Sequence, residues 1–223
     1  MNPILVTGAT GVVGSNVVRE LQRRAVPVRA FVRDGARARA MLDDQMDCAV
    51  GDFTDPGSVR NGLLGVDGVL LCCANNPRQL EDKVTVIDAA VDSGIGRLVK
   101  ISANGAQIGS PLEFWDAHGH IEQHLRESGL PSVVPRPGTH RSNLLAAADT
   151  IKSMGRLFAP AGDAKLSMVD PRGVAAVAAL VLTEGGHDGR TYTLTGPDAV
   201  TYDEAAPATG RRNRAAGSVR QHS

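Results

Sequence analysis

The stretch VTGATGVVG, residues 6–14, places three glycines three positions apart, directly after the apolar run Ile4–Thr7. Ser15–Arg24 follows with apolar residues at helical spacing. Glycines where a strand turns into a helix permit a tight turn and let backbone N–H groups approach a pyrophosphate at the positive end of the helix dipole. We therefore interpret the stretch as a dinucleotide-binding loop, with a plain strand–helix turn as the alternative.

The rest of the chain alternates short β-branched runs with helix-like segments, which is typical of βαβ units. We expect further strands over Val28–Val32, Cys48–Gly51, Val69–Ala74, Leu98–Ser102, Ser132–Pro135 and Thr191–Leu194. We expect further helices near Ala36–Leu42, Pro56–Leu64, Gln79–Asp92, Leu112–Glu127 and Pro171–Leu182. This order predicts an α/β fold with a doubly wound parallel sheet, the Rossmann fold.

The alternation loosens after Arg136. We expect residues 1–136 to form the dinucleotide-binding domain and 137–206 a small cap region packed on it. Thr201 and Glu204 have the spacing of a capping box, which predicts a helix start that Pro207 would interrupt. The arginine-rich segment 207–223 lacks apolar periodicity, so we expect a disordered tail there, with a basic arm that binds its own partner as the alternative.

Composition excludes several classes of protein. The formal net charge is zero, so we expect neither nucleic acid nor a membrane surface as a partner. No stretch is long and apolar enough to predict a membrane span. The three cysteines form neither a disulfide framework nor a metal-ligand spacing, which favours the cytoplasm.

The choice of cofactor depends on the end of the second predicted strand. An acidic residue there would bind the ribose 2′-hydroxyl of NAD, whereas the sequence AFVRDG puts Arg33 first and Asp34 second. A guanidinium binds a 2′-phosphate through two hydrogen bonds. Arg33, with Arg37 as a helper, therefore favours NADPH over NADH. Asp34 is the counter-argument, and a solvated loop charge is the alternative for Arg33.

Six stretches follow one another along the chain: ILVTGATGVVGSNVVREL, FVRD, VGDFTDPGSV, GRLVKISANGA, IEQHLRESGL and VVPRPGTHRSNLL. Together they resemble the NmrA-like, atypical branch of the short-chain dehydrogenase/reductase family, from Ile4 to about Ala206. The resemblance implies an NAD(P)-binding Rossmann domain with a small substrate subdomain. Such proteins include NADPH-dependent quinone reductases, flavin-type reductases and non-catalytic redox sensors. Members of this family usually continue with a further helix and more of the substrate subdomain after the position of Ala206, so we expect a truncated or replaced C-terminus here.

The resemblance also implies positions for single residues. Asp52 and Phe53 would lie near the adenine, Ala74 and Asn75 beside the ribose, and Ser102 near the nicotinamide, where it would hydrogen-bond a substrate carbonyl. The predicted cofactor-binding residues are then Gly8, Thr10, Gly11, Val12, Val13, Gly14, Arg33, Asp52, Phe53, Ala74 and Asn75.

The helix after the fifth predicted strand lacks the usual catalytic pair of this family. A Tyr and a Lys four residues apart share a helix face, and the Lys lowers the pKa of the phenol. Here the two positions fall on Phe114 and His118. We predict His118, with Ser102, as the catalytic residues, because an imidazole that titrates near neutrality can donate a proton. The alternative is a hydrogen-bonded histidine at the edge of the cleft.

Two other features of this region receive no catalytic role. Lys100 is interpreted as a charge at the edge of a strand. His120 and His124 are four residues apart, but no third ligand follows, so we expect no metal site.

These observations predict an NAD(P)H-dependent oxidoreductase that transfers hydride to a quinone, flavin or similar small acceptor without a Tyr/Lys pair. Such acceptors need little acid catalysis, because their reduced forms are stabilised anions. The alternative is a non-catalytic NADP(H) sensor that binds a partner protein. An epimerase or dehydratase is disfavoured, since those relatives also use the missing pair.

Overall fold

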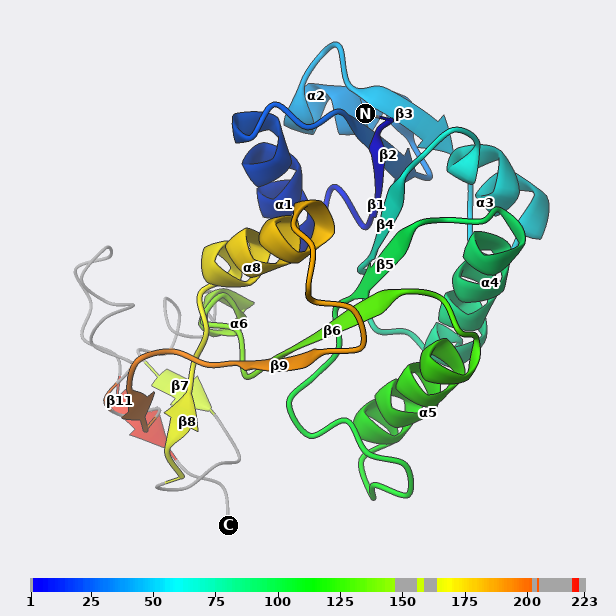
Figure 1. Ribbon diagram of the computed structural model, residues 1–223. Coiled ribbons are helices and arrows are strands. Elements are labelled where there is room, and N and C mark those ends of the chain that lie inside the picture. Colours follow the sequence, from blue (N-terminus) through cyan, green and yellow to red (C-terminus); the bar gives the residue numbers. More distant parts are fainter. Residues whose placement is uncertain (1, 147–155, 159–163, 202–203, 205–217, 221–223) are drawn as a thin grey trace. The chain divides into compact units, whose positions relative to one another are not determined.

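Seven strands form the central sheet in the order β3-β2-β1-β4-β5-β6-β9 (Figure 1). They are β1 (Ile4–Thr7), β2 (Val28–Val32), β3 (Asp47–Val50), β4 (Gly68–Leu71), β5 (Arg97–Lys100), β6 (Ser132–Pro137) and β9 (Thr191–Leu194). The first six pair in parallel. Strand order reverses between β1 and β4, so the predicted doubly wound parallel sheet is confirmed. In such sheets ligands bind where the order reverses, at the carboxyl ends of the strands.

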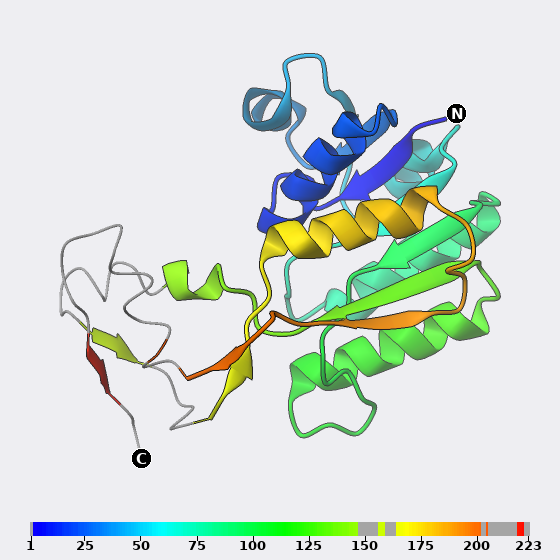
Figure 2. The same cartoon turned by 60° about the vertical axis from the view of Figure 1, so that its left-hand side comes forward.

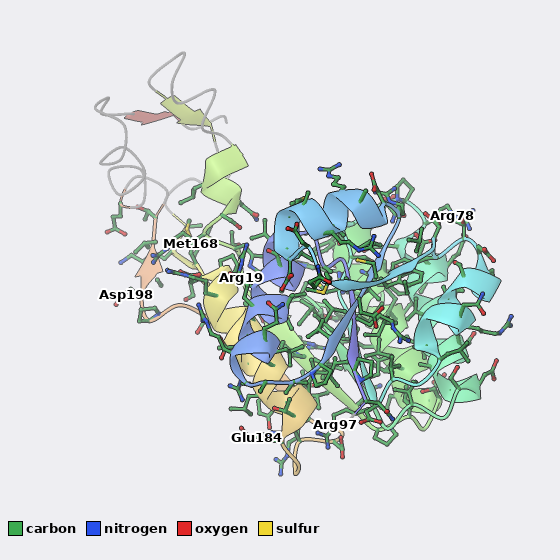
Figure 3. The ribbon with its side chains drawn as sticks, turned by 90° about the horizontal axis from the view of Figure 1, so that it is seen from above. Arg19, Arg78, Arg97, Met168, Glu184 and Asp198 are labelled. Carbon is green, nitrogen blue, oxygen red and sulfur yellow. The ribbon has the colours of Figure 1, made fainter. Side chains whose placement is uncertain are left out.

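Helices cover both faces of this sheet. Their bounds are α1 (Val12–Arg23), α2 (Gly35–Leu42), α3 (Pro56–Leu63), α4 (Gln79–Asp92), α5 (Glu113–Glu127) and α8 (Pro171–Thr183). Figure 1 shows α1 and α8 on one face and α3, α4 and α5 on the other. In Figure 2 as well, α1 and α8 lie side by side. Arg97 at the start of β5 anchors the end of α8: its guanidinium donates to the carbonyls of Val181 at 3.1 Å and Glu184 at 2.5 Å (Figure 3).

The computed structural model describes residues 2–146, 156–158, 164–201, 204 and 218–220. The chain divides into two compact units. The first comprises Met1–Arg136 and Arg172–Thr193, and the second comprises Pro137–Pro171 and Leu194–Ser223. The segment that carries α8 thus returns to the first unit. The role of 137–206 as a cap stays a prediction.

The second unit contains short elements. These are α6 (Asn143–Ala146), β7 (Arg156–Phe158), β8 (Leu166–Ser167), β10 (Ala199–Val200) and β11 (Ser218–Arg220). Strand β10 pairs antiparallel with β8, and β11 pairs parallel with β7. The capping box is present: the Thr201 N–H donates to the Glu204 carboxylate at 2.9 Å, and the Glu204 N–H donates to the Thr201 hydroxyl at 3.1 Å. Pro207 and the rest of the predicted tail, apart from β11, lie outside the described residues.

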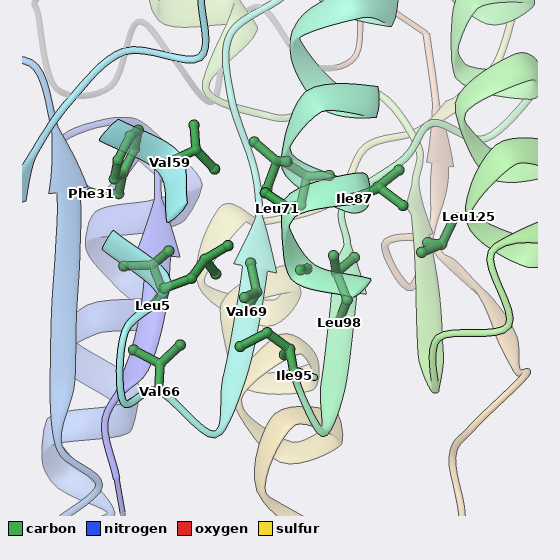
Figure 4. Close-up of a cluster of buried hydrophobic side chains, with 14 of the residues drawn as sticks. Leu5, Phe31, Val59, Val66, Val69, Leu71, Ile87, Ile95, Leu98 and Leu125 are labelled. Carbon is green, nitrogen blue, oxygen red and sulfur yellow. The ribbon is translucent and has the colours of Figure 1, made fainter. Parts of the chain in front are cut away.

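Apolar side chains from β1, β4 and β5 fill the space between the sheet and helices α3, α4 and α5. Alternate residues of a strand point to opposite faces, so Val69 and Leu71 of β4 enter this cluster together. Figure 4 shows them beside Leu5, Ile87 and Leu98, all at most 1% exposed. Burial of each such side chain contributes about 1.5–3 kcal/mol. This core fixes the positions of β4 and β5 and of the residues that follow them.

Among the described residues, no helix combines the length and apolar character that a bilayer span requires.

Most predicted elements agree with the structure, and α4 and β9 have the predicted bounds. The strand predicted over Val69–Ala74 ends at Leu71 instead. The reason is the Thr7 side chain, whose single hydroxyl proton is shared between the carbonyl oxygens of Leu70 and Cys72, 3.0 and 3.1 Å from Oγ1. It also accepts from the Cys72 N–H at 2.8 Å, so these groups bond to a side chain instead of continuing the ladder.

Two helical glycines allow a matched test of the packing at the loop. A Cβ on Gly14 would lie 2.1 Å from the Gly8 carbonyl oxygen, whereas a Cβ on Gly173 of α8 would meet nothing within 4 Å. We expect Gly14→Ala to lower the free energy of unfolding by about 1–3 kcal/mol. Gly173→Ala should raise it by about 0.5–1 kcal/mol, since alanine favours the helix. Urea denaturation measures both, and equal effects of the same sign would contradict the close packing.

Candidate active site

The glycine loop brings the backbone of β1 against that of β4. Gly8 has φ +60°, a left-handed conformation, and a Cβ there would lie 2.1 Å from the Cys72 carbonyl oxygen. The Gly11 N–H donates to the Gly8 carbonyl at 2.8 Å, which closes the turn. No larger residue fits at Gly8 or Gly14 without displacing the backbone.

Helix α1 begins immediately after this turn. Gly11 is its N-cap, and no side chain caps the first N–H groups. Free N–H groups at a helix start bind phosphate oxygens. Of the predicted loop residues, Val13 and Gly14 are buried and Thr10 is half-buried, while Gly11 is exposed and Val12 is 56% exposed. The loop therefore fits a pyrophosphate bound by backbone groups.

At the end of β2, the structure shows what the Asp34 side chain bonds to. The Asp34 side chain is the N-cap of α2 and accepts from the Arg37 N–H at 3.0 Å. A carboxylate committed to this cap is a poor partner for a ribose hydroxyl. Arg33 is exposed beside it. Asp34 therefore carries less weight against NADPH than the sequence suggested.

The predicted adenine-side residues follow β3. Hydrogen bonds from the N–H and hydroxyl of Thr54, at 2.9 and 2.8 Å, lower the pKa of Asp52, and the nearby charges of Arg33 and Arg78 lower it further. Phe53 stacks on Phe31 of β2, with ring centroids 5.6 Å apart. Ala74 and Asn75 lie exposed in the loop after β4. The cofactor contacts of all four residues stay predictions.

The two positions of the absent Tyr/Lys pair touch each other on α5. The ring of Phe114 meets that of His118 edge-on, with centroids 4.8 Å apart. Phe114 is 36% exposed, whereas His118 is 3% exposed. His118 therefore lies on the buried face of α5, with Ile121 and Leu125.

Behind His118 lies a buried polar cluster that the sequence did not reveal. Lys100, at 0% exposure, places Nζ 2.7 Å from Ser102 Oγ and 2.7 Å from His118 Nδ1. The Ser102 hydroxyl donates to the Glu122 carboxylate. Arg136 of β6 donates to both oxygens of that carboxylate, from Nε at 3.1 Å and from Nη2 at 2.5 Å. We call these five residues the β5–α5 cluster.

The interpretation of Lys100 as a charge at a strand edge is wrong. Strand β5 lies inside the sheet, between β4 and β6, and Lys100 at its end is 0% exposed. Glu122, missed as well, is 3% exposed. The only sequence signal for the cluster was the presence of charged residues on an otherwise apolar strand and helix face.

Burial and charge set the protonation of the cluster. Burial, followed by the charges of Lys100 and Lys83, lowers the pKa of His118 to about 2. His118 is therefore neutral at physiological pH, and the expectation that it titrates near neutrality is wrong. Burial also lowers the pKa of Lys100 well below its usual value, against the opposing charge of Glu122.

The other two histidines of α5 pair with carboxylates. His120 lies 3.6 Å from Asp116, and His124 lies 2.6 Å from Asp88 on α4. Among the described residues, no group of three or more potential ligands could hold a metal ion.

A sequence profile of NAD(P)H-binding proteins matches residues 8–185. The chain belongs to this NAD(P)H-binding family. It is 37% identical over 205 residues to an NAD(P)H azoreductase of Xenophilus azovorans, covering 92% of this chain and 72% of the azoreductase. It is 32% identical over 206 residues to quinone oxidoreductase 2 of Escherichia coli, covering 91% of this chain and 72% of that protein.

Solved structures agree with this assignment. The Escherichia coli quinone oxidoreductase complexed with NADPH superposes with a TM-score of 0.87 and 29% identity, over 99% of this chain and 78% of that one. Citrobacter sp. triphenylmethane reductase complexed with NADP(H) gives a TM-score of 0.87 and 25% identity, over 99% and 79% of the two chains. The predicted family, Rossmann fold and NAD(P)H-dependent oxidoreductase activity are thereby confirmed.

The neutral His118 makes stability sensitive to acid. Its folded pKa lies below the unfolded value of about 6.5, so the unfolded chain binds more protons and stability falls as pH falls below that value. Between about pH 7 and pH 5, His118 should account for a loss of about 2 kcal/mol. In His118→Gln, which keeps an acceptor for Lys100, this loss should be absent. Urea unfolding at the two pH values measures it, and equal losses in both proteins would contradict the assignment.

Proposed function

We propose that this chain uses NADPH to reduce a quinone, a flavin or a similar electron-poor small molecule. The observation that carries the proposal is the pair Phe114 and His118, an apolar ring and a neutral imidazole at the positions of the usual phenol and ammonium. Reduction of a simple carbonyl to an alcohol needs a strong proton donor at the position of the phenol. A quinone or flavin does not, because its reduced anion is already stabilised.

Cofactor binding in this proposal uses the loop and the end of β2. Backbone N–H groups at the start of α1 would bind the pyrophosphate, and the exposed Arg33 would bind the 2′-phosphate. When bound, NADPH supplies the hydride. The commitment of Asp34 to the cap of α2 supports NADPH over NADH. The two structural relatives, solved as complexes with NADPH and NADP(H), support it as well.

The acceptor class rests on the same relatives. Their names describe an azoreductase, a quinone oxidoreductase and a triphenylmethane reductase. All three substrates are conjugated molecules that take a hydride into a delocalised system. We therefore propose a small-molecule acceptor, with neither nucleic acid nor a membrane as partner, consistent with a formal net charge of zero.

We also propose the cytoplasm as the place of action. The three cysteines are unpaired and half-buried, as in a reducing compartment. Burial raises the pKa of the Cys72 thiol to about 12, so it stays protonated and unreactive.

Replacement of Arg33 tests the cofactor preference. A charge-assisted pair with a phosphate is worth about 1.5–3 kcal/mol, so Arg33→Ala should weaken NADPH binding by roughly 10- to 100-fold and leave NADH binding nearly unchanged. Arg60→Ala, an exposed change of equal charge on α3, is the control and should affect neither. Isothermal titration measures all four affinities. Equal losses for both cofactors in Arg33→Ala would reject the phosphate role.

Turnover tests the acceptor class. We expect loss of NADPH absorbance with quinones, flavins or azo dyes, and none with simple ketones, which need the missing phenol. Tight binding of NADPH without turnover on any acceptor would reject the reductase and support the alternative, a sensor that binds a partner protein.

A further inference from the structure

Lys100 has an unusual set of partners for a fully buried lysine. The carboxylate oxygen of Glu122 nearest to its Nζ is 3.9 Å away, beyond hydrogen-bond distance. Both oxygens of Glu122 already bond to Arg136, and one of them also bonds to Ser102. The close partners of Lys100 are instead the hydroxyl of Ser102 and the Nδ1 of His118, each at 2.7 Å.

This arrangement determines which nitrogen of His118 carries the proton. An ammonium donates and cannot accept, and a neutral imidazole has one donor and one acceptor nitrogen. When Lys100 is an ammonium, the Nδ1 at 2.7 Å can only accept from it, so we infer that the proton of the neutral ring is on Nε2. The ring is therefore held with Nε2–H as its only donor.

The same bonds change the role of Ser102. Its single proton goes to the carboxylate of Glu122, and its oxygen accepts from Lys100. A hydroxyl whose proton is committed to a carboxylate cannot donate to a substrate carbonyl. Of the two predicted catalytic residues, His118 and not Ser102 is therefore the one left to give a proton to an acceptor.

We propose that Lys100 is the positioning residue for proton delivery in the proposed reductase, acting through His118. After hydride transfer the acceptor is an anion. It takes the proton of His118 Nε2, and Lys100 passes one proton to Nδ1, which leaves a neutral imidazole and a neutral amine. The return transfer from Nδ1 to Lys100, with a solvent proton to Nε2, restores both groups. The inference rests on the proposed function for the identity of the acceptor alone.

The surroundings of Lys100 make it a better proton donor than an ordinary lysine. The groups that act on it are Glu122 of α5, Arg136 of β6, Lys83 of α4 and Cys73 after β4. Burial and the two cations lower its pKa, which makes the ammonium more acidic, while Glu122 and Cys73 oppose this. Because the ammonium form is the active one, kcat should fall as pH rises through the lowered pKa of Lys100.

The test compares Lys100→Met with Lys83→Met. Both lysines are at most 1% exposed, and methionine fills a similar volume without charge. Heteronuclear NMR of the imidazole nitrogens reports the His118 tautomer without any turnover. We expect the native chain and Lys83→Met to show Nε2–H, and Lys100→Met to lose this single tautomer. With the best acceptor, Lys100→Met should lose about 10-fold in kcat with little change in KM, less than full general acid catalysis provides, because the reduced anion is already stabilised. The fall of kcat at alkaline pH should disappear in this variant.

Two outcomes would overturn the proposal. One is an unchanged His118 tautomer in Lys100→Met. The other is an equal loss of kcat and of the alkaline fall in Lys83→Met, which would indicate a general effect of removing a buried lysine. A native chain that shows the Nε2–H tautomer but reduces no acceptor would reject the proposed function and leave the role of Lys100 in setting the tautomer standing.

Discussion

The close contact between Gly8 and the Cys72 carbonyl is the constraint on which the site depends. It lies just beyond the paired residues of β1 and β4, and the absence of a Cβ lets the two backbones touch there. The Thr7 hydroxyl fixes the same junction by bonding to both backbone groups of Cys72. Because α1 starts from this turn and the loop after β4 leaves from it, one contact sets the phosphate end and the ribose end of the predicted cofactor site together.

The sheet also fixes the position of the β5–α5 cluster. Strand β5 pairs with β4 from Gly68–Arg97 to Leu71–Lys100, so Lys100 is placed by backbone hydrogen bonds. Its side chain then reaches α5, which packs on α4 over the apolar core. A buried ammonium, a buried carboxylate and the half-buried guanidinium of Arg136 are costly in such a place unless every group is hydrogen-bonded. The bonds among the five members meet this condition and hold each side chain in one orientation.

Local patterns were sufficient for the loop and for most elements of the first unit, because strand–glycine–helix spacing is a property of neighbouring residues. The bounds of α4 followed from one apolar face, and the cap by Asp34 could have been read from its position just before a helix. The β5–α5 cluster could not be predicted from such local patterns. Its members come from β5, the loop after it, α5 and β6, and a lone Lys100 in LVKIS gives no sign of which neighbours will surround it. The pKa of His118 depends on that same unseen lysine.

Loss of the phenol does not leave the site without a route for protons. A structural role alone is a weak account of Lys100, because an apolar side chain of similar size would fill the space without the cost of burying an amine. Groups with strongly shifted pKa values concentrate at functional sites for this reason. In this structure the buried lysine, Lys100, is on strand β5 instead of on the helix, and His118 occupies the helix position of the usual lysine. The acidity that remains is modest, which suits acceptors whose reduced anions need little help and excludes those that need a strong acid.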